Sequence, residues 1–418
     1  MAVDKNLFMY DLAIVAIMRN EAAYVKEWIE YHWAAGVDHF YIYDNESPDN
    51  FKEVLQPYID LGIVTYEFYP GKGRQVEAYI EAIQKYRFFC RYIAFIDADE
   101  FIYPQNTDKS IVEIVDKILN EQDTKHNSGL AINWMMYGSN NLEKADYSKG
   151  VLERFTKRAE TMHEFVKTVA NPRQIDYMLT PHYMIYFGEL NDVYESLIIK
   201  EPRILVNHYS LRSREEYKKK IGFSAAYGHT TTHTKKTFTH KMNNDVFDDS
   251  ILTYFAKRRK IRGEIHKEEI DDLKLFRTMM AAIEPILKME ISEDFFVGKM
   301  ETFLTCRVLI AYLRDKGLFK PETAQNAETL ILTAINLTLH KERSIAGLQM
   351  LLREFPEILS SKNPQIERIL DSCIIQVDKL KKAVHSQINE ATKSNIWEKW
   401  KRIHELSRLL KGFYNYIK

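Results

Sequence analysis

The chain has 418 residues and a mass of 49.3 kDa, more than one hydrophobic core usually supports, so two domains are expected. Hydrophobic residues at 45% and charged residues at 28% are ordinary globular proportions and exclude a disordered or fibrous protein. The 58 Lys and Arg nearly balance the 59 Asp and Glu, so no basic footprint for nucleic acid is present, and a nucleic-acid partner is not expected.

The cysteines and the apolar segments indicate a cytoplasmic protein. Cys90, Cys306 and Cys373 are scattered without CxxC spacing and are interpreted as buried thiols in a reducing compartment. The first apolar run, 12–18, is not followed by a small-residue cleavage site, so no secretion signal is inferred. No apolar stretch approaches the ~20 residues that span a bilayer, so any membrane contact is expected to be peripheral.

Strand and helix patterns alternate over the first hundred residues. Alternation with short links predicts a mostly parallel sheet with helices on both faces, which binds ligands at the carboxyl ends of its strands. Apolar runs predict strands over 12–18, 39–43, 63–68 and 92–96, and helical periodicity predicts helices over 21–35, 51–61 and 75–89.

The pattern changes twice further along the chain. Strands are predicted near 129–137, 166–170 and 204–209, and the polar segment 228–244 is interpreted as a linker or a lid. The remainder is helical in pattern, through 268–290, 296–316, 322–339 and 343–357. We therefore predict an α/β domain over 1–227, the polar segment 228–244, and an all-α domain over 245–418.

The segment FIDADEF, residues 95–101, places two carboxylates where a buried strand ends. Asp97 and Asp99 are two residues apart, so at an extended strand end they project to the same side. A divalent cation held by such carboxylates and by substrate phosphates would neutralise them. A solvated acidic turn is the alternative.

Two further polar segments follow predicted strands of the same sheet. Arg19, Asn20 and Glu21 come after the first strand, and Asp44 comes after the second. Together they predict a cleft for a nucleotide, with Asp44 accepting a hydrogen bond from the base or ribose. Helix capping at 19–21 and an Asx turn at Asp44 are the alternatives.

The string RNEAAYVKEWIEYHWAAGVDHFYIYDNESPD followed by FIDADEF resembles glycosyltransferase family 92 and the family 2-like transferases. The resemblance continues through WMMYGSNN, VLERF, HEFVKTVANP and VNHYSLRSREEYKKK, and so covers roughly residues 10–220. It implies the GT-A fold, a Rossmann-like nucleotide-diphospho-sugar transferase fold, and a nucleotide-sugar donor with a glycan acceptor.

The resemblance also implies roles for matching residues. Asp97 and Asp99 would hold Mn²⁺ or Mg²⁺ against the donor diphosphate, with His208 as a further metal ligand or phosphate contact. A buried core histidine is the alternative for His208. Asp44 would recognise the base, with 19–21 lining the pocket. Lys167 and Arg212 are candidate phosphate contacts, and a surface lysine is the alternative for Lys167.

An acceptor base is harder to assign. Inverting enzymes of this fold use an acid at the start of a helix after the acceptor-side strand, and Glu153 best matches that order. A surface ion pair is the alternative, and Glu164, Glu189 and Asp192 are competitors. Trp134 and Tyr137 are expected to stack on an acceptor sugar or to pack in the core.

The predicted function is an inverting, metal-dependent transfer of a sugar from a UDP-sugar to a glycan or lipid-linked glycan acceptor in cell-surface polysaccharide synthesis. A basic, aromatic-bearing helix over 395–418 is interpreted as docked on its own domain or as a peripheral membrane contact. The role of residues 245–418 is left open, and homo-oligomerisation is one alternative. A nucleotidyltransferase is disfavoured because no Gly-rich loop follows the first strand, and a non-catalytic nucleotide-binding scaffold remains the alternative function.

Overall fold

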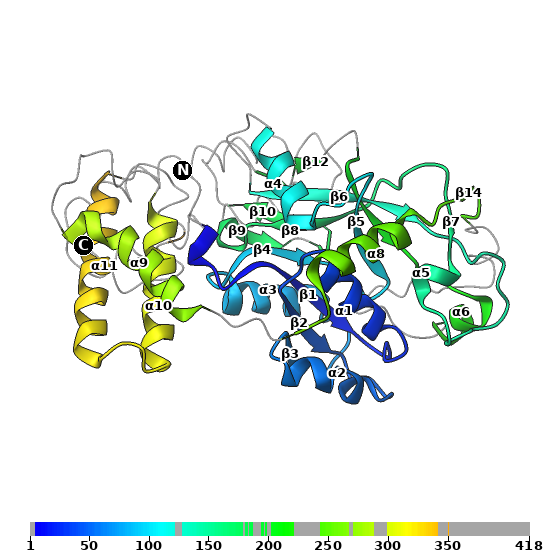
Figure 1. The fold of residues 1–418 in the computed structure, drawn as a ribbon, viewed down its shortest axis with the longest axis horizontal. Helices are drawn as coiled ribbons and strands as arrows, with labels where there is room; N and C mark the ends of the chain where they lie inside the picture. Colours follow the sequence, from blue (N-terminus) through cyan, green and yellow to red (C-terminus); the bar gives the residue numbers. More distant parts are fainter. Residues whose placement is uncertain are drawn as a thin grey trace, which may run out of the picture. The chain divides into compact units, whose positions relative to one another are not determined.

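The computed structural model describes residues 5–121, 128–178, 180–182, 184–186, 194–195, 197–198, 202–220, 243–266, 271–287, 299–341 and 350. The chain divides into two compact units, which are described separately (Figure 1). The larger unit comprises Phe8–Tyr186 and Glu195–Ile270. The smaller comprises Met1–Leu7, Phe187–Tyr194 and Asp271–Lys418.

A mixed sheet forms the centre of the larger unit. Its strands lie in the order β3-β2-β1-β4-β8-β6-β13-β5, and β12 also pairs with β6. The pairs from β3 through β4 are parallel, as is β6 with β13, whereas β8 is antiparallel to both of its neighbours. The strands are β1 (Tyr10–Met18), β2 (His39–Asp44), β3 (Val64–Phe68), β4 (Cys90–Phe95), β5 (Glu100–Pro104), β6 (Gly129–Met136), β8 (Val166–Ala170), β12 (Leu197–Ile198) and β13 (Ile204–His208).

Helices cover both faces of this sheet. Alternate residues of β1 pack with α1, α2 and α4 in one core, while α3 packs on the opposite face, where the Tyr79 and Phe95 ring centroids are 5.2 Å apart. The helices are α1 (Val25–Ala34), α2 (Phe51–Asp60), α3 (Gln75–Tyr86), α4 (Ile111–Glu121), α5 (Val151–Arg154), α6 (Arg214–Lys220) and α8 (Ser250–Arg262). The predicted α/β fold with a mostly parallel sheet is therefore confirmed.

The remaining strands and the 3₁₀ helices of the described residues are short. The strands β7 (Lys157–Arg158) and β14 (Val246–Phe247) pair antiparallel, and β9 (Ile175–Met178), β10 (Met184–Tyr186) and β11 (Tyr194–Glu195) form a small sheet. Two 3₁₀ helices are η1 (Lys5–Leu7) and η2 (Pro172–Gln174). Strand β5 and helix α4 were not predicted from the sequence. Yet α4 begins with a capping box, in which the Glu113 amide donates to Ser110 Oγ and the Ser110 amide donates to Glu113 Oε2.

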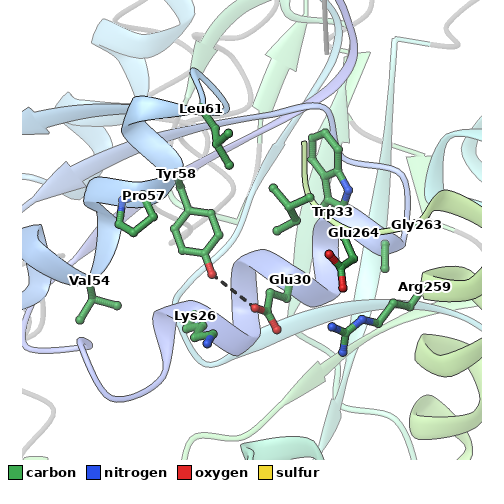
Figure 2. Close-up of a pocket in the computed structure, with 12 residues that line it drawn as sticks. Lys26, Glu30, Trp33, Val54, Pro57, Tyr58, Leu61, Arg259, Gly263 and Glu264 are labelled. Atoms are coloured by element: carbon green, nitrogen blue, oxygen red, sulfur yellow. Dashed lines mark hydrogen bonds between the residues drawn. The ribbon is translucent and has the colours of Figure 1, made fainter. Parts of the chain in front are cut away.

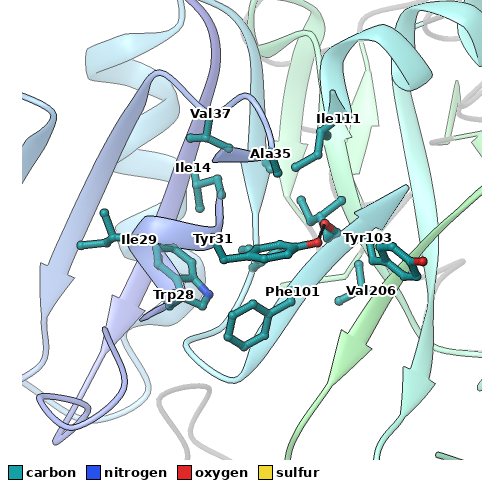
Figure 3. Packing of buried hydrophobic residues seen from close by; sticks show 14 of the residues in the cluster. Ile14, Trp28, Ile29, Tyr31, Ala35, Val37, Phe101, Tyr103, Ile111 and Val206 are labelled. Carbon is teal, nitrogen blue, oxygen red and sulfur yellow. Dashed lines mark hydrogen bonds between the residues drawn. The ribbon is translucent and has the colours of Figure 1, made fainter. Parts of the chain in front are cut away.

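The aromatic face of α1 fixes the position of β5. Figure 3 shows Trp28 and Tyr31 of α1 packed near Phe101 and Tyr103. Trp28 Nε1 donates to the Glu100 carbonyl at 2.9 Å, and the Tyr31 hydroxyl donates to the Ile102 carbonyl at 2.8 Å. His32 Nδ1 bonds the Trp28 carbonyl, and its Nε2 accepts from the Ile102 amide. Burial lowers the pKa of His32 to about 3, so the imidazole is neutral and fills both roles. These bonds hold the strand that follows Asp97 and Asp99.

Helix α8 belongs to the larger unit, so the division between the units falls after Ile270 rather than at residue 245. Arg258 is buried and donates from Nε to the Ala34 carbonyl and from Nη1 to the Asp108 carbonyl. Arg262 donates to the Trp33 and Val37 carbonyls and pairs with Asp38. Two arginines therefore cap the end of α1 from α8, an arrangement that helical periodicity alone does not reveal.

The smaller unit is helical in its described part. It contains α9 (Asp272–Leu287), α10 (Met300–Asp315) and α11 (Pro321–Lys341), close to three of the predicted helices. Phe303, Leu309 and Ile331 are buried there. The predicted helix over 343–357 lies outside the described residues except for position 350, and the whole segment 395–418 lies outside them. Among described helices, none combines the length and apolarity needed to cross a bilayer.

Replacing Arg258 with alanine should destabilise the protein by about 1–3 kcal/mol, because the buried Ala34 carbonyl and the partly buried Asp108 carbonyl lose their donor. Arg259→Ala is the matched control, since Arg259 is exposed on the same helix, and it should change stability by less than ~0.5 kcal/mol. Urea unfolding followed by circular dichroism measures both. Equal effects of the two substitutions would show that α8 is not held by the Arg258 hydrogen bonds.

Candidate functional site

The carboxyl ends of β1, β2 and β4 lie side by side, as expected. Met18 pairs with Asp44 in the β1–β2 ladder, and the Asn45 amide donates to the Met18 carbonyl at 2.8 Å. Phe95, the last residue of β4, pairs with Val15 of β1. The segments after these three strands therefore meet at one edge of the sheet, where polar side chains collect.

Asp97 and Asp99 lie in a tight turn between β4 and β5, not at an extended strand end. The Glu100 amide donates to the Asp97 carbonyl at 3.1 Å, and the Asp97 amide donates to Glu100 Oε2 at 2.8 Å. The Tyr209 amide, just beyond β13, donates to the Asp99 carbonyl at 2.8 Å. Because of the turn, the two aspartates have different partners.

Asp97 is held by a lysine buried in the sheet. Lys167 of β8 is 1% exposed, and its Nζ lies 2.9 Å from Asp97 Oδ2 and 3.6 Å from Glu100 Oε2. Gln75 Nε2 donates to Asp97 Oδ1 at 2.6 Å. Burial opposes the charge on Lys167, but the carboxylates outweigh it and raise the pKa of its ammonium. The surface position considered for Lys167 is therefore wrong. Its positive charge is instead paired with Asp97 and Glu100.

Glu100 is fully buried beside this pair. Burial raises its pKa to about 7, against the opposing effect of Lys167. Its Oε1 atom has no hydrogen-bond partner among the described residues.

Asp99 faces a histidine and a second lysine. Its Oδ1 is 3.5 Å from His208 Nε2, and its Oδ2 is 2.9 Å from Lys220 Nζ. Burial opposes ionisation of Asp99, but Lys220 and His208 outweigh it and lower the pKa of the carboxyl well below its usual range. Asp99 in turn raises the pKa of His208 against the effect of burial. Asp99 and His208 are thus brought together as expected.

Asp99 and His208 are the candidate ligands for a divalent cation. Within the part of the chain that the structure describes, no group of three or more acidic, histidine or cysteine side chains is arranged to hold a metal ion. Asp99 and His208 form a pair of one oxygen and one nitrogen ligand, and His208 Nδ1 is buried without a hydrogen-bond partner among the described residues. Such a pair fits an ion that takes its other ligands from substrate phosphates and water.

Asp44 is buried and both of its carboxylate oxygens accept hydrogen bonds. The Ser47 amide donates to Oδ1 at 2.9 Å, which is the Asx turn considered as an alternative, and the Tyr66 hydroxyl donates to Oδ2 at 2.7 Å. Arg19 is exposed at the neighbouring strand end. Asn20 has a φ of 58°, in the left-handed region that asparagine tolerates, and its amide donates to Ser47 Oγ.

A buried ionic network joins the segment after β1 to the segment after β13. Arg212 is 2% exposed, pairs with Glu21 at 2.9 Å, and lies 3.6 Å from the Tyr24 ring centroid. The Tyr24 hydroxyl donates to Glu216, which is paired at 2.9 Å with the buried Arg154. Arg212 therefore holds the Glu21 carboxylate in place.

A cluster of aromatic and histidine rings surrounds Trp134 of β6. Its ring centroid lies 4.4 Å from that of His208, 5.4 Å from that of Phe165, and 5.3 Å from that of His182. Trp134 Nε1 is buried without a hydrogen-bond partner among the described residues. Tyr137 is instead packed in the core, where its ring lies 4.5 Å from that of Tyr209. Only Trp134 of the predicted pair faces the site residues.

Glu153 lies on the short helix α5. Its side chain is 55% exposed and pairs with Lys149 at 3.2 Å, in the surface ion pair considered as its alternative. Glu164 is exposed, and Glu189 and Asp192 lie outside the described residues, as do 228–242 of the predicted lid.

Sequence reasoning missed Gln75 and Lys220. The neighbouring Lys219 is exposed and pairs with Glu215. Lys220 lies one helical turn after the buried Glu216, so the phase of α6 turns Lys220, rather than Lys219, toward Asp99. That phase could have been read from Ser213 and Glu216, whose spacing matches a capping box.

A separate pocket of about 410 Å³ opens between α1, α2 and the residues after α8 (Figure 2). Trp33, Tyr58 and Leu61 supply its apolar lining, and Figure 2 shows Tyr58 directed toward Glu30. None of its lining residues belongs to the cluster around Asp97 and Asp99.

Removing the Glu216 charge should give a pH-dependent loss of stability. Burial raises the pKa of Glu216, but the hydrogen bonds from Arg154 and Ser213 outweigh burial and lower it to about 2. A depressed folded-state pKa stabilises the protein above the unfolded value of 4.5, and this contribution is lost as pH falls toward 2. Glu216→Gln should cost about 3 kcal/mol at pH 7 and progressively less below pH ~4.5.

Urea unfolding at several pH values between 3 and 7 measures this difference, with the exposed Glu143→Gln as control. A difference that does not change with pH would contradict the assignment of the ionised carboxylate.

Comparison with known proteins shows the family to which the chain belongs. A family model described as glycosyltransferase family 92 matches residues 15–250. A family 92 protein of Ricinus communis is 24% identical over 214 residues, 51% of this chain and 37% of that protein. One of Oryza sativa subsp. japonica is 26% identical over 215 residues, 51% of this chain and 35% of that protein. The chain thus matches little more than a third of the length of these relatives.

Two further similarities are more limited. A galactan β-1,4-galactosyltransferase of Arabidopsis thaliana is 33% identical over 89 residues, 19% of this chain and 17% of that protein. The crystal structure of an S. aureus TarS fragment, 1-349, aligns at 12% identity with a TM-score of 0.26, covering 77% of this chain and 90% of that one. Because the family model matches more than half of the sequence, the chain belongs to glycosyltransferase family 92.

Proposed function

We propose that this chain is a metal-dependent, inverting glycosyltransferase that moves a hexose from a nucleotide-diphospho-sugar, with UDP as the nucleotide, to a glycan or lipid-linked glycan in cell-surface polysaccharide synthesis. The observation that carries the proposal is the Asp99–His208 pair beside Lys220, at the sheet edge where β1, β2 and β4 end, in a member of family 92. The limited similarity to a galactan galactosyltransferase supports a hexosyl donor and a glycan acceptor.

The leaving diphosphate is the group that needs stabilisation. A bound Mn²⁺ or Mg²⁺ would supply electrostatic stabilisation of the leaving group. Asp99 and His208 would bind such an ion, and Lys220 adds a positive charge at the same carboxylate. Asp97 contributes by positioning, because its carboxylate is held by Lys167 and Gln75.

The nucleotide base and ribose would lie along the ends of β1 and β2. Arg19 is exposed there, and Asn20 and Glu21 are partly exposed beside it. Asp44 recognises the base only by exchanging its bond to Tyr66 or Ser47 for one to the ligand. Arg212 holds Glu21 in place, so its contribution to donor binding is indirect.

Thermal unfolding with a panel of nucleoside diphosphates tests the donor site. A ligand at 100 times its dissociation constant stabilises the folded state by about 2.7 kcal/mol, so UDP with Mn²⁺ should raise Tm by roughly 5–10 °C. UDP without metal should give a smaller shift. No shift with any nucleotide in a folded sample would favour a scaffold that does not bind donors, and a shift without turnover of any sugar would favour a non-catalytic nucleotide-binding protein.

Replacing Asp99 with asparagine should remove the metal-dependent part of the UDP shift and reduce transfer by at least about 10²-fold, since electrostatic stabilisation of the leaving group is lost. Excess chelator should have the same effect on the wild type. Asp60→Asn is the control, because Asp60 is exposed and bonds only Gln56 in the described structure. Full activity of Asp99→Asn would disprove a metal-binding role for Asp99.

A further inference from the structure

We infer that His182 is the general base that removes the proton from the acceptor hydroxyl, with the acceptor sugar held against the exposed ring of Phe165. The inference rests on the proposed function, for which it supplies the base that Glu153 does not provide. Three observations carry it: the tautomer of His182, the contrast with the neighbouring histidines, and the rings around it.

The tautomer of His182 follows from one hydrogen bond. Its Nδ1 lies 2.9 Å from the Val166 carbonyl oxygen, and a carbonyl can only accept, so Nδ1 carries the hydrogen. In the neutral ring Nε2 then has a free lone pair. Burial lowers the pKa of His182, and the nearby Lys167 charge adds to this, so the ring is neutral at physiological pH. A neutral imidazole with an oriented Nε2 is suited to accept a proton.

The other histidines near Trp134 are arranged differently. His163 Nδ1 accepts from the Phe165 amide at 3.1 Å, so in the neutral ring its Nε2 bears hydrogen and is a donor. His208 directs Nε2 toward Asp99 at 3.5 Å. Of the three rings, His182 is the one whose backbone hydrogen bond leaves Nε2 as the acceptor.

The surrounding rings form a surface suited to a sugar. Phe165 is 44% exposed, and its ring stacks against His182 with centroids 5.5 Å apart and planes at 26°. Trp134, next to both, is buried and supports the Phe165 and His182 rings from below the surface. Because Trp134 also contacts the ring of His208, this surface adjoins the proposed donor site.

The step balances without any further reagent. The acceptor hydroxyl gives its proton to His182 Nε2 while its oxygen forms the new bond to the anomeric carbon of the donor. The bond from that carbon to the diphosphate oxygen breaks, and the nucleoside diphosphate leaves with the electron pair. His182 then releases the proton to solvent.

The test uses His182→Asn, whose side-chain amide retains a donor for the Val166 carbonyl but lacks the distal nitrogen. With UDP-galactose and β-1,4-galactotetraose as probes, kcat should fall by about 10²–10⁴-fold. The Tm shift with UDP and Mn²⁺ should remain that of the wild type. His182→Ala should behave similarly, and His266→Gln, at an exposed histidine outside the site, should leave activity unchanged.

A second measurement does not depend on turnover. Nitrogen-15 NMR of histidine-labelled protein should show a His182 signal, absent from His182→Asn, with Nδ1 protonated and Nε2 bare. The opposite tautomer overturns the inference, as does transfer by His182→Asn within tenfold of the wild type, or loss of the UDP shift in both variants. If the wild type itself neither binds UDP nor transfers sugar, the proposed function fails, and the tautomer alone then decides whether His182 is poised as a base.

Discussion

A lysine buried in the sheet is the constraint on which the site depends. The Lys167 ammonium is removed from water on an antiparallel strand between β4 and β6, and two carboxylates, Asp97 and Glu100, compensate its charge. An unpaired buried charge of this kind typically costs 3–5 kcal/mol, so the lysine and the acidic turn stabilise each other. The turn after β4 is thereby fixed before any ligand binds.

One continuous segment supplies the other side of the site. Strand β13 pairs with β5 so that His208 lies opposite Glu100, next to the acidic turn. The chain then passes Arg212, which has a left-handed φ of 52°, and enters α6 through the Ser213–Glu216 capping box. Since Glu216 is anchored by Arg154, the helix phase delivers Lys220 to Asp99. A single strand, turn and helix thus place a histidine and a lysine on one carboxylate.

The parts of this site that local pattern determines could be predicted, and those that depend on distant partners could not. Apolar runs located the ends of β1, β2 and β4, and therefore Arg19, Asp44 and Asp97. The occupation of Asp44 by Tyr66, from a neighbouring strand, depends on ladder register. Lys167 was expected to contact a phosphate, with a surface position as the alternative, and only the fold shows the carboxylates that allow its burial.

The two aspartates of the acidic turn therefore have different roles, although their spacing suggested equivalent ones. Both carboxylate oxygens of Asp97 accept hydrogen bonds, one from the buried Lys167 and one from Gln75 at the start of α3. Displacing these bonds would leave the buried Lys167 charge without its partner. Asp99 instead faces Lys220 at the end of a short helix and the Nε2 atom of the His208 imidazole. The partners of Asp99 can therefore be exchanged at a lower free-energy cost than those of Asp97. The same two-residue spacing thus yields one carboxylate held by a buried lysine and one that, in the proposed function, binds the metal ion.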